Sequence, residues 1–214
     1  MESQLDRILE PEWMDTFEEA DAYDRMDHSA VNRAFVESLL ALRPDQGTVL
    51  DVGTGPGHIP IELATRTTST RIVAVDAARH MLAYGRRHVE RTGFADRVRL
   101  VCSDGKRLPF PDATFDAVMT NSIVHHIPDP VPCFRELRRV LKPDGALLIR
   151  DLGLLKPTGG QERGYRAGTE NLPGALGFAA AIEEAEPDHA ALRARLDDQL
   201  KRSGAVVVAE NSPR

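Results

Sequence analysis

Cysteine is scarce in this sequence of 214 residues, which contains only Cys102 and Cys133. The two do not form a Cys-x-x-Cys pair, so the sequence predicts neither a disulfide framework nor a zinc motif, and we interpret both thiols as small apolar fillers. Long apolar runs are lacking too, and none approaches the ~20 residues of a membrane-spanning helix. The first twenty residues are acidic and amphipathic, unlike a signal peptide. We therefore expect a cytoplasmic protein.

An excess of basic charge is also absent. The sequence has 27 Lys and Arg against 33 Asp and Glu, a formal net charge of −6. This balance disfavours electrostatic docking on nucleic acid or on an anionic membrane, and a small neutral or cationic substrate fits it better. The length and the hydrophobic share of 42% are ordinary for one soluble globular domain, or one and a fraction.

A glycine-rich turn is the most informative stretch that is present. An apolar run over 48–52 contains Asp51, and glycines at 53, 55 and 57 precede an amphipathic stretch over 58–66. This order predicts a strand, a tight turn and a helix. A ligand lying on the glycines would meet the amides at the helix start, and Asp51 would face any cation above the strand end. No Gly-Lys-Ser/Thr follows, which excludes a P-loop, and the Gly-x-Gly-x-Gly spacing disfavours a nicotinamide-binding motif.

Strands and helices alternate along the chain. We predict strands over 48–52, 71–76, 97–102, 115–122 and 146–152, and helices over 29–42, 58–66, 78–92 and 131–141. One face of the first helix carries Val31, Ala34, Phe35, Ser38, Leu39 and Leu42. Asp129-Pro130 is expected to cap the last helix with proline at its first position, and 142–145 to end it. The alternation predicts an α/β fold with a doubly wound, mostly parallel sheet and a ligand site at the carboxyl ends of strands one, two and four.

Asp76 ends the second predicted strand, nineteen residues beyond Gly57. Doubly wound folds place at this position the acid that accepts both ribose hydroxyls of a nucleoside. A strand-end Asp is also a common helix cap. The position relative to the glycines favours the ligand role.

The run from Asp51 to Gly57 resembles motif I of the class I S-adenosylmethionine-dependent methyltransferases. A second run, Leu108 to Val118 with His125-His126 after it, is similar to the small-molecule branch of that family. The resemblance implies a Rossmann-like core over 1–155, with lid helices in 1–46. It also implies S-adenosyl-L-methionine as cofactor and methyl transfer to a small-molecule acceptor by in-line displacement (EC 2.1.1.-). Whether oxygen, nitrogen or carbon is methylated stays open.

The same resemblance assigns roles in the cofactor site. The methionine ammonium is expected near Asp51, the ribose on Asp76, adenine between Met81 and the Asp104 turn, and the sulfonium beside Asn121. The full expected set is Asp51, Gly53, Thr54, Gly55, Gly57, Asp76, Ala77, Met81, Ser103, Asp104, Gly105, Asn121 and Ser122. Met81 alone would be interpreted as core. In the lid, Tyr23 either contacts the cofactor or packs the lid helix on the core. No metal site is expected.

His125 and His126 are the candidate general bases for a hydroxyl acceptor, since an unperturbed imidazole titrates near neutral pH. The alternative is that one packs under the loop and the other is solvated. Asn121 is followed by Ser-Ile-Val rather than by the Pro-Pro-Tyr/Phe of base methyltransferases, so methylation of nucleic-acid bases is disfavoured.

The C-terminal part departs from the family. Residues 159–171 resemble the glycine-rich loop of the cysteine desulfurases, 173–182 its following helix, and 183–204 a second helix, with a possible strand over 206–209. This fragment, 156–214, lacks the cofactor lysine and nucleophilic cysteine of that family, so we predict no desulfurase activity. A gene fusion is the simplest origin. Strands six and seven are missing, which predicts an exposed sheet edge. Either the strand over 206–209 covers that edge, or the edge pairs with another chain in a homodimer. The alternative function is an inactive cofactor-binding or relic module.

Overall fold

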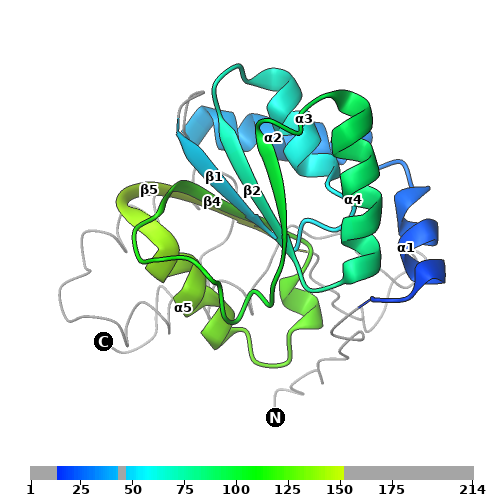
Figure 1. Ribbon diagram of the computed structural model, residues 1–214. Helices are drawn as coiled ribbons and strands as arrows, with labels where there is room; N and C mark the ends of the chain where they lie inside the picture. Colours follow the sequence, from blue (N-terminus) through cyan, green and yellow to red (C-terminus); the bar gives the residue numbers. More distant parts are fainter. Residues whose placement is uncertain (1–13, 43–46, 152–214) are drawn as a thin grey trace, which may run out of the picture.

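The computed structural model describes residues 14–42 and 47–151, which form a five-stranded sheet with helices on both faces (Figure 1). In chain order the elements are α1 (Phe17–Asp24), α2 (Ser29–Leu42), β1 (Thr48–Val52), α3 (His58–Arg66), β2 (Arg71–Asp76), α4 (Arg79–Thr92), β3 (Val98–Cys102), β4 (Phe115–Asn121), the short 3-10 helix η1 (Val124–His126), α5 (Val131–Val140) and β5 (Leu141–Arg150).

The sheet has the strand order β3-β2-β1-β4-β5, and every described pairing is parallel. This confirms the predicted doubly wound α/β fold. β1 lies between β2 and β4, so the chain reverses its direction of winding beside β1. In open parallel sheets this switch point, at the carboxyl ends of the strands, is where ligands bind.

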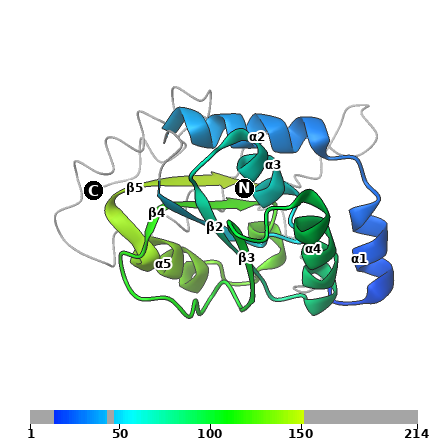
Figure 2. The same cartoon turned by 45° about the horizontal axis from the view of Figure 1, so that its top comes forward.

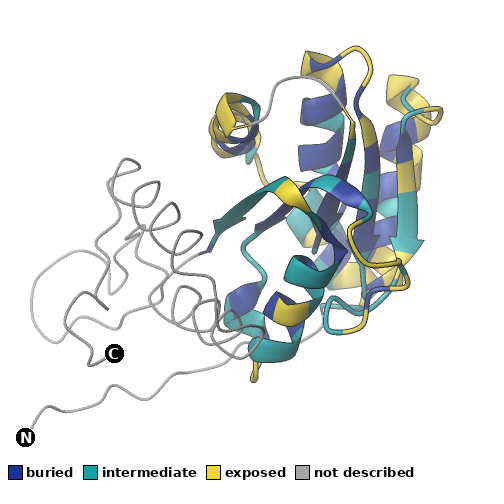
Figure 3. Cartoon of the chain, turned by 90° about the vertical axis from the view of Figure 1, so that its left-hand side faces the viewer, coloured by how far each residue is buried: buried dark blue, intermediate teal, exposed yellow. Residues whose placement is uncertain are grey.

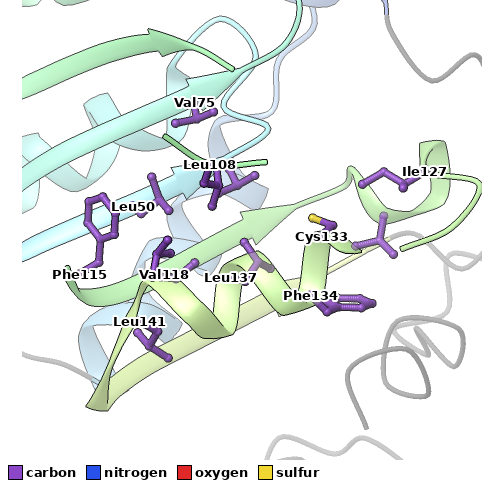
Figure 4. Close-up of a cluster of buried hydrophobic side chains, with 13 residues drawn as sticks. Leu50, Val75, Leu108, Phe115, Val118, Ile127, Cys133, Phe134, Leu137 and Leu141 are labelled. Atoms are coloured by element: carbon purple, nitrogen blue, oxygen red, sulfur yellow. The ribbon is translucent and has the colours of Figure 1, made fainter. Parts of the chain in front are cut away.

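Two apolar cores cover the two faces of the sheet. Alternate residues of β1 point to opposite faces, and Leu50 belongs to the core under α5 whereas Val49 belongs to the core under α2, α3 and α4. Figure 2 shows these three helices on one side of the sheet and α5 on the other. Figure 4 shows Phe134 and Leu137 of α5 turned toward the sheet. Because both faces are covered, the central strands are apolar almost throughout.

Lid helices were expected in 1–46, but the bounds of α1 were not predicted, because its sequence carries no apolar period. Its start is nevertheless specified by a capping box: the Glu19 amide donates to the Thr16 hydroxyl at 3.2 Å, and the Thr16 amide donates to the Glu19 carboxylate at 3.1 Å. Ala20 is its one fully buried residue. The helix is fastened to α4, where the Tyr84 hydroxyl donates to the Asp21 carboxylate at 2.9 Å.

The buried face of α2 differs from the predicted one. Phe35 and Leu39 are buried as expected, but the other buried positions are Asn32 and Val36. Val31 is 53% exposed and Leu42 is 40% exposed. Figure 3 shows α2 with one buried and one exposed side. Both sets have helical spacing, so periodicity alone could not choose between two stripes that share Phe35 and Leu39.

The predicted boundary between α5 and β5 was wrong. The helix ends at Val140, and Leu141 already pairs with Phe115 of β4. The register then shifts, so that Ala117 pairs with Ala146 and the residues between form an irregularity within β5. At the other end of α5, Pro130 is the N-cap rather than the first helical residue, and the Asp129 carboxylate accepts the Val131 amide at 3.1 Å.

The two cysteines lie in different environments. Cys133 is buried in the core under α5, as expected of an apolar filler, and burial raises the pKa of its thiol to about 12. Cys102 is exposed at the end of β3, so the filler interpretation was wrong for it.

The predictions made for 152–214, including the desulfurase-like fragment, its helices and the strand over 206–209, lie outside the described residues. Within the part that the structure describes, no helix is both long and apolar enough to cross a membrane.

Arg139 on α5 holds the loop between β3 and β4. Its guanidinium donates to the carbonyls of Phe110 at 2.7 Å and Leu108 at 3.0 Å, and to the Glu136 carboxylate at 2.6 and 2.7 Å. The Glu136 carboxylate in turn accepts the Leu108 amide at 2.7 Å. This arrangement lowers the pKa of Glu136, chiefly through its hydrogen bond with Arg139.

We expect Arg139→Ala to lower the free energy of unfolding by about 2 kcal/mol, because hydrogen bonds to charged groups each contribute roughly 1.5–3 kcal/mol and Arg139 is partly exposed. Urea denaturation with Arg138→Ala as the matched control measures this. The Glu136 contribution is present above its unfolded pKa of about 4.3 and is lost as the pH falls through its lowered folded value. The difference between wild type and variant should therefore shrink in acid, and a constant difference would contradict this account.

Candidate functional site

A pocket opens at the carboxyl ends of the strands, at the predicted switch point. Its walls come from the turns after β1, β2, β3 and β4, from the start of α4, and from α1. Most of the predicted site residues line it, namely Gly53, Gly55, Asp76, Ala77, Met81, Ser103, Asp104, Gly105, Asn121, Ser122 and His126. Asp51, Thr54, Gly57 and His125 lie near it without lining it.

The turn after β1 depends on its glycines. Gly53, Gly55 and Gly57 have φ values of 77°, 55° and 77°, in the left-handed region that favours glycine. A Cβ on Gly53 would lie 2.0 Å from the Ile123 side chain. The Gly53 and Thr54 amides both donate to the Val75 carbonyl, at 2.8 and 3.0 Å. The turn is therefore held against the end of β2, and its glycines leave the floor of the pocket without side chains.

Asp76 ties this turn to helix α4. One carboxylate oxygen accepts the Gly55 amide at 2.7 Å and the other accepts the Ala78 amide at 2.8 Å. Ala78 is the N-cap of α4, and no side chain caps that helix. Asp76 holds the amide of the N-cap residue and is not itself the helix cap. Burial raises its pKa, and the bonds from the two amides oppose that rise. Each oxygen keeps a further lone pair for a ligand in the pocket that Asp76 lines, and the ribose role stays a prediction.

Asp51 is buried beneath the glycine turn, with 1% of its surface exposed. Among the described residues its Oδ2 atom has no hydrogen-bond partner, and neither has the nearby Thr54 hydroxyl. Burial raises the pKa of Asp51 to about 7. A buried carboxyl oxygen without a partner is costly, and a cation or a hydrogen-bond donor would relieve that cost.

Helix α1 covers one side of the pocket. Tyr23 lines the pocket and packs with Ala20, Ala78 and Met81. A Cβ on Gly55 would lie 3.8 Å from the Tyr23 ring, so the ring lies over the glycine turn. Burial raises the pKa of Tyr23, and the nearby Asp76 and Asp51 raise it further. Tyr23 therefore packs the lid helix on the core, as one of the two alternatives predicted, and its ring also faces the pocket where a ligand could contact it.

The turn after β3 forms the opposite wall. The Asp104 carboxylate accepts the Lys106 amide at 2.8 Å, and its other oxygen lies 3.4 Å from the Lys106 ammonium. A Cβ on Gly105 would lie 2.9 Å from the Val52 side chain, so glycine lets this turn approach β1. Sequence reasoning missed Lys106 and Val52 as pocket residues, although their positions beside Gly105 and at the end of β1 would have indicated them.

Asn121 and Ser122 end β4 at the pocket. The Arg150 guanidinium donates to the Asn121 side-chain oxygen at 2.8 Å, and the Ser122 amide donates to the Arg150 carbonyl at 2.8 Å. Ser122 has a φ of 58°, a value uncommon for residues other than glycine, asparagine or aspartate. The end of β5 therefore positions both residues.

The two histidines occupy different places. His126 lines the pocket. His125 is turned to Asp151, whose carboxylate contacts its Nδ1 atom and accepts its amide at 3.0 Å. Asp151 is only 5% exposed. The imidazole rings lie 4.1 Å apart. Neither histidine is simply solvated, and His126 is the one of the two that lines the pocket.

Comparisons with known proteins agree with this architecture. The family model described as "Methyltransferase domain" matches residues 50–149. A ubiquinone/menaquinone biosynthesis C-methyltransferase of Geobacter sulfurreducens is 38% identical over 104 residues, which are 48% of this chain and 41% of the relative. A malonyl-[acyl-carrier protein] O-methyltransferase of a Methylovorus species is 34% identical over 126 residues, 58% of this chain and 43% of the relative. The chain thus spans less than half the length of both.

A solved structure adds evidence for the fold alone. A proposed S-adenosyl-L-methionine-dependent methyltransferase from Methanococcus maripaludis superposes with a TM-score of 0.60 at 19% identity, covering 95% of this chain and 82% of that one. The family model and the relatives support a class I S-adenosylmethionine-dependent methyltransferase segment over 50–149. The solved structure supports its Rossmann-like fold.

Proposed function

We propose that this protein transfers a methyl group from S-adenosylmethionine to a small-molecule acceptor. One observation carries the proposal. The bare glycine turn, the Asp76 and Asp104 carboxylates and the end of β4 converge on one pocket. Beneath the turn lies the buried Asp51, whose Oδ2 atom lacks a hydrogen-bond partner among the described residues. The relatives are named as a C-methyltransferase and an O-methyltransferase, which supports methyl transfer in general.

The residues present fit the parts of this cofactor. An ammonium group would be the positively charged hydrogen-bond donor that the Asp51 Oδ2 atom lacks beneath the turn. A ribose diol has acceptors in the Asp76 carboxylate. An adenine ring has the apolar side chain of Met81 on one side and the Asp104 turn on another. The bare backbone of Gly53 and Gly55 leaves room for the methionine portion.

When bound, the cofactor supplies an electrophilic methyl group on a sulfonium, so the protein needs little covalent chemistry of its own. The residues of the pocket align and enclose the reactants, which lowers the barrier through proximity and exclusion of water. Tyr23 on α1 covers the glycine turn, and Arg150 orients Asn121 at the inner end of the pocket. Because α1 is part of the pocket wall, the lid segment would help to enclose the bound cofactor.

His126 would serve as general base where the acceptor is a hydroxyl group. It lines the pocket, and its neighbour His125 is held by Asp151. The two relatives are named for different methyl acceptors, one methylated on carbon and one on oxygen, so they support no single acceptor. The inactive cofactor-binding module is the alternative, and it predicts binding of S-adenosylhomocysteine without turnover.

The remaining sequence-based expectations stay predictions. These are a cytoplasmic location, a gene-fusion origin for 156–214 without desulfurase activity, absence of nucleic-acid and membrane partners, and a homodimer through the edge of the sheet. β5 is the edge strand of the described sheet, which is the observation that motivates the last of them.

We expect wild-type protein to bind S-adenosylhomocysteine in a calorimetric titration with micromolar affinity, and Asp76→Ala to lose that binding. The carboxylate supplies the ribose acceptors and holds the turn. Asp96→Ala, an exposed aspartate away from the pocket, is the matched control. Because Asp76 also organises the turn, circular dichroism must show the variant folded. Retained affinity in a folded Asp76→Ala variant would contradict the assignment.

Asp51→Asn should separate stability from binding. The pKa of Asp51 is about 7 in the ligand-free fold and about 3.9 in the unfolded chain, so its burial lowers stability as the pH rises from 4 to 7. One pKa unit corresponds to about 1.4 kcal/mol. The variant should therefore be more stable at pH 7 by on the order of 1–4 kcal/mol, with no gain below pH 4, while S-adenosylhomocysteine binds more weakly.

Urea denaturation at pH 7 and below pH 4 measures this change in stability, with Asp96→Asn as the control. A variant that is less stable than wild type at neutral pH would contradict the buried, uncompensated state of Asp51. Unchanged ligand affinity would contradict its role toward the ammonium group.

His126→Gln should lower kcat on a hydroxyl acceptor by about 100-fold or more, the usual contribution of a general base. The KM for the cofactor should change little, because the cofactor-binding side chains stay in place. His80→Gln, an exposed histidine outside the pocket, is the control. Transfer of a radiolabelled methyl group measures the effect, and an unchanged kcat would exclude His126 as the base.

A further inference from the structure

Three side chains from separate elements meet behind the glycine turn, outside the pocket. Asp24 is the last residue of α1, His58 the first residue of α3, and His88 lies within α4. One ligand atom from each lies within 4.8 Å of the other two. His58 Nε2 is 2.9 Å from one Asp24 oxygen, and His88 Nε2 is 3.4 Å from the other. The proposed methyl transfer uses none of the three.

The hydrogen bonding of His88 leaves its Nε2 atom in an unusual position. Its Nδ1 atom lies 3.0 Å from the Pro56 carbonyl, and a carbonyl can only accept, so Nδ1 carries a proton. In the neutral ring, Nε2 is then a bare acceptor that faces a carboxylate oxygen, another acceptor. A proton on either the His88 Nε2 atom or the Asp24 carboxyl, or a cation between the two atoms, turns this contact into an attraction.

The surroundings favour one shared cation over two imidazolium ions. The rings of His58 and His88 stack with their centroids 5.1 Å apart, so two protonated rings would repel each other. His58 stands at the first position of α3, where the helix dipole disfavours positive charge on a side chain. Asp24 stands at the last position of α1, where the dipole disfavours a negative charge, and no basic residue lies in that last turn. A dication would compensate Asp24 while both rings stay neutral.

We propose that Asp24, His58 and His88 bind a divalent transition metal of the Zn²⁺ class, which fastens α1 to α3 and α4. Two imidazole nitrogens and one carboxylate oxygen are a ligand set that Zn²⁺ accepts, with water completing the coordination. At bond lengths of about 2.1 Å, the ligand atoms of a tetrahedral site lie roughly 3.4 Å apart. Each imidazole nitrogen already lies within 0.5 Å of this distance from one of the two Asp24 oxygens.

Two further features suit a metal site. The bond from His88 Nδ1 to the Pro56 carbonyl is the kind of outer contact that fixes the tautomer and ring orientation of a metal-binding histidine. The side chains are 10% to 28% exposed, which leaves a path for an ion from solvent. The sequence alone predicted no metal site, because the three residues come from elements that only the fold brings together.

The experiment titrates tag-free, full-length protein, first stripped with a chelator, with Zn²⁺ in a calorimeter near neutral pH. We expect one site per chain in wild type. Asp24→Asn and His88→Gln should each weaken it by more than about 100-fold, since loss of an outer partner alone costs about 10- to 100-fold. His80→Gln is the matched control, because His80 pairs with Asp15 at 3.0 Å on the surface but has no second histidine.

Two independent readouts accompany the titration. Co²⁺ should give the visible absorption of a tetrahedral site in wild type and in the control, but not in the two cluster variants. Zn²⁺ should raise the Tm of wild type and of His80→Gln only, since a ligand stabilises the state that binds it. Circular dichroism without metal establishes that each variant is folded. The proposal would be overturned if wild type had no site of one Zn²⁺ per chain. It would also be overturned if Asp24→Asn and His88→Gln bound Zn²⁺ as tightly as wild type, or if His80→Gln lost as much affinity as they do.

Discussion

The carboxylate of Asp76 connects the parts of the chain on which the pocket depends. It accepts amides from Gly55 in the turn after β1 and from Ala78 at the start of α4. The turn is also held by the two amides that donate to the Val75 carbonyl in β2. With β1 between β2 and β4, these bonds place a bare backbone at the switch point of a parallel sheet. The positions of Met81 and Tyr23 follow, because α4 starts there and α1 packs on α4.

Asp76 stabilises the fold around the pocket, whereas Asp51 lowers the stability of the ligand-free protein. Its carboxyl is buried beneath the turn without a partner for Oδ2 in the described part of the chain, an arrangement that lowers the stability of the ligand-free protein. Such strain is common at functional sites, where a ligand later supplies the missing interaction. Asp24, His58 and His88 pose a similar problem on the other side of the turn. In both places the fold leaves an acceptor without a donor, and in both we propose that a cation supplies the missing interaction.

The parts of the fold with strong local signals were predicted well. The bounds of β1, β2 and α3 agree with the prediction residue by residue, because apolar runs end at acids and glycines that leave few alternatives. The confluence of Gly53, Asp76 and Asp104 also followed from the parallel topology. The bounds of α1 were missed, although lid helices were expected there, because only Thr16 and Glu19 mark its start. The predicted inward face of α2 was wrong because two helical stripes shared the same large residues.

Other features depend on contacts between distant segments, which no local pattern encodes. The register shift that starts β5 at Leu141 depends on pairing with Phe115. The different placement of His125 and His126 depends on Asp151, which lies beyond β5. The exposure of Cys102 depends on β3 being the edge of the described sheet. Each of these required the neighbours in space, and the function assigned to the pocket depends on the same neighbours.

The most direct test of the account follows backbone amides by nuclear magnetic resonance while S-adenosylhomocysteine is added. The account predicts that the amides of Gly53, Gly55 and Asp104 shift along one common saturation curve. Those of Gly47 and Asp116, at the opposite ends of β1 and β4, should stay unchanged. Shifts confined to other parts of the molecule, or no shifts in a folded protein, would contradict a cofactor site at the carboxyl edge of the sheet.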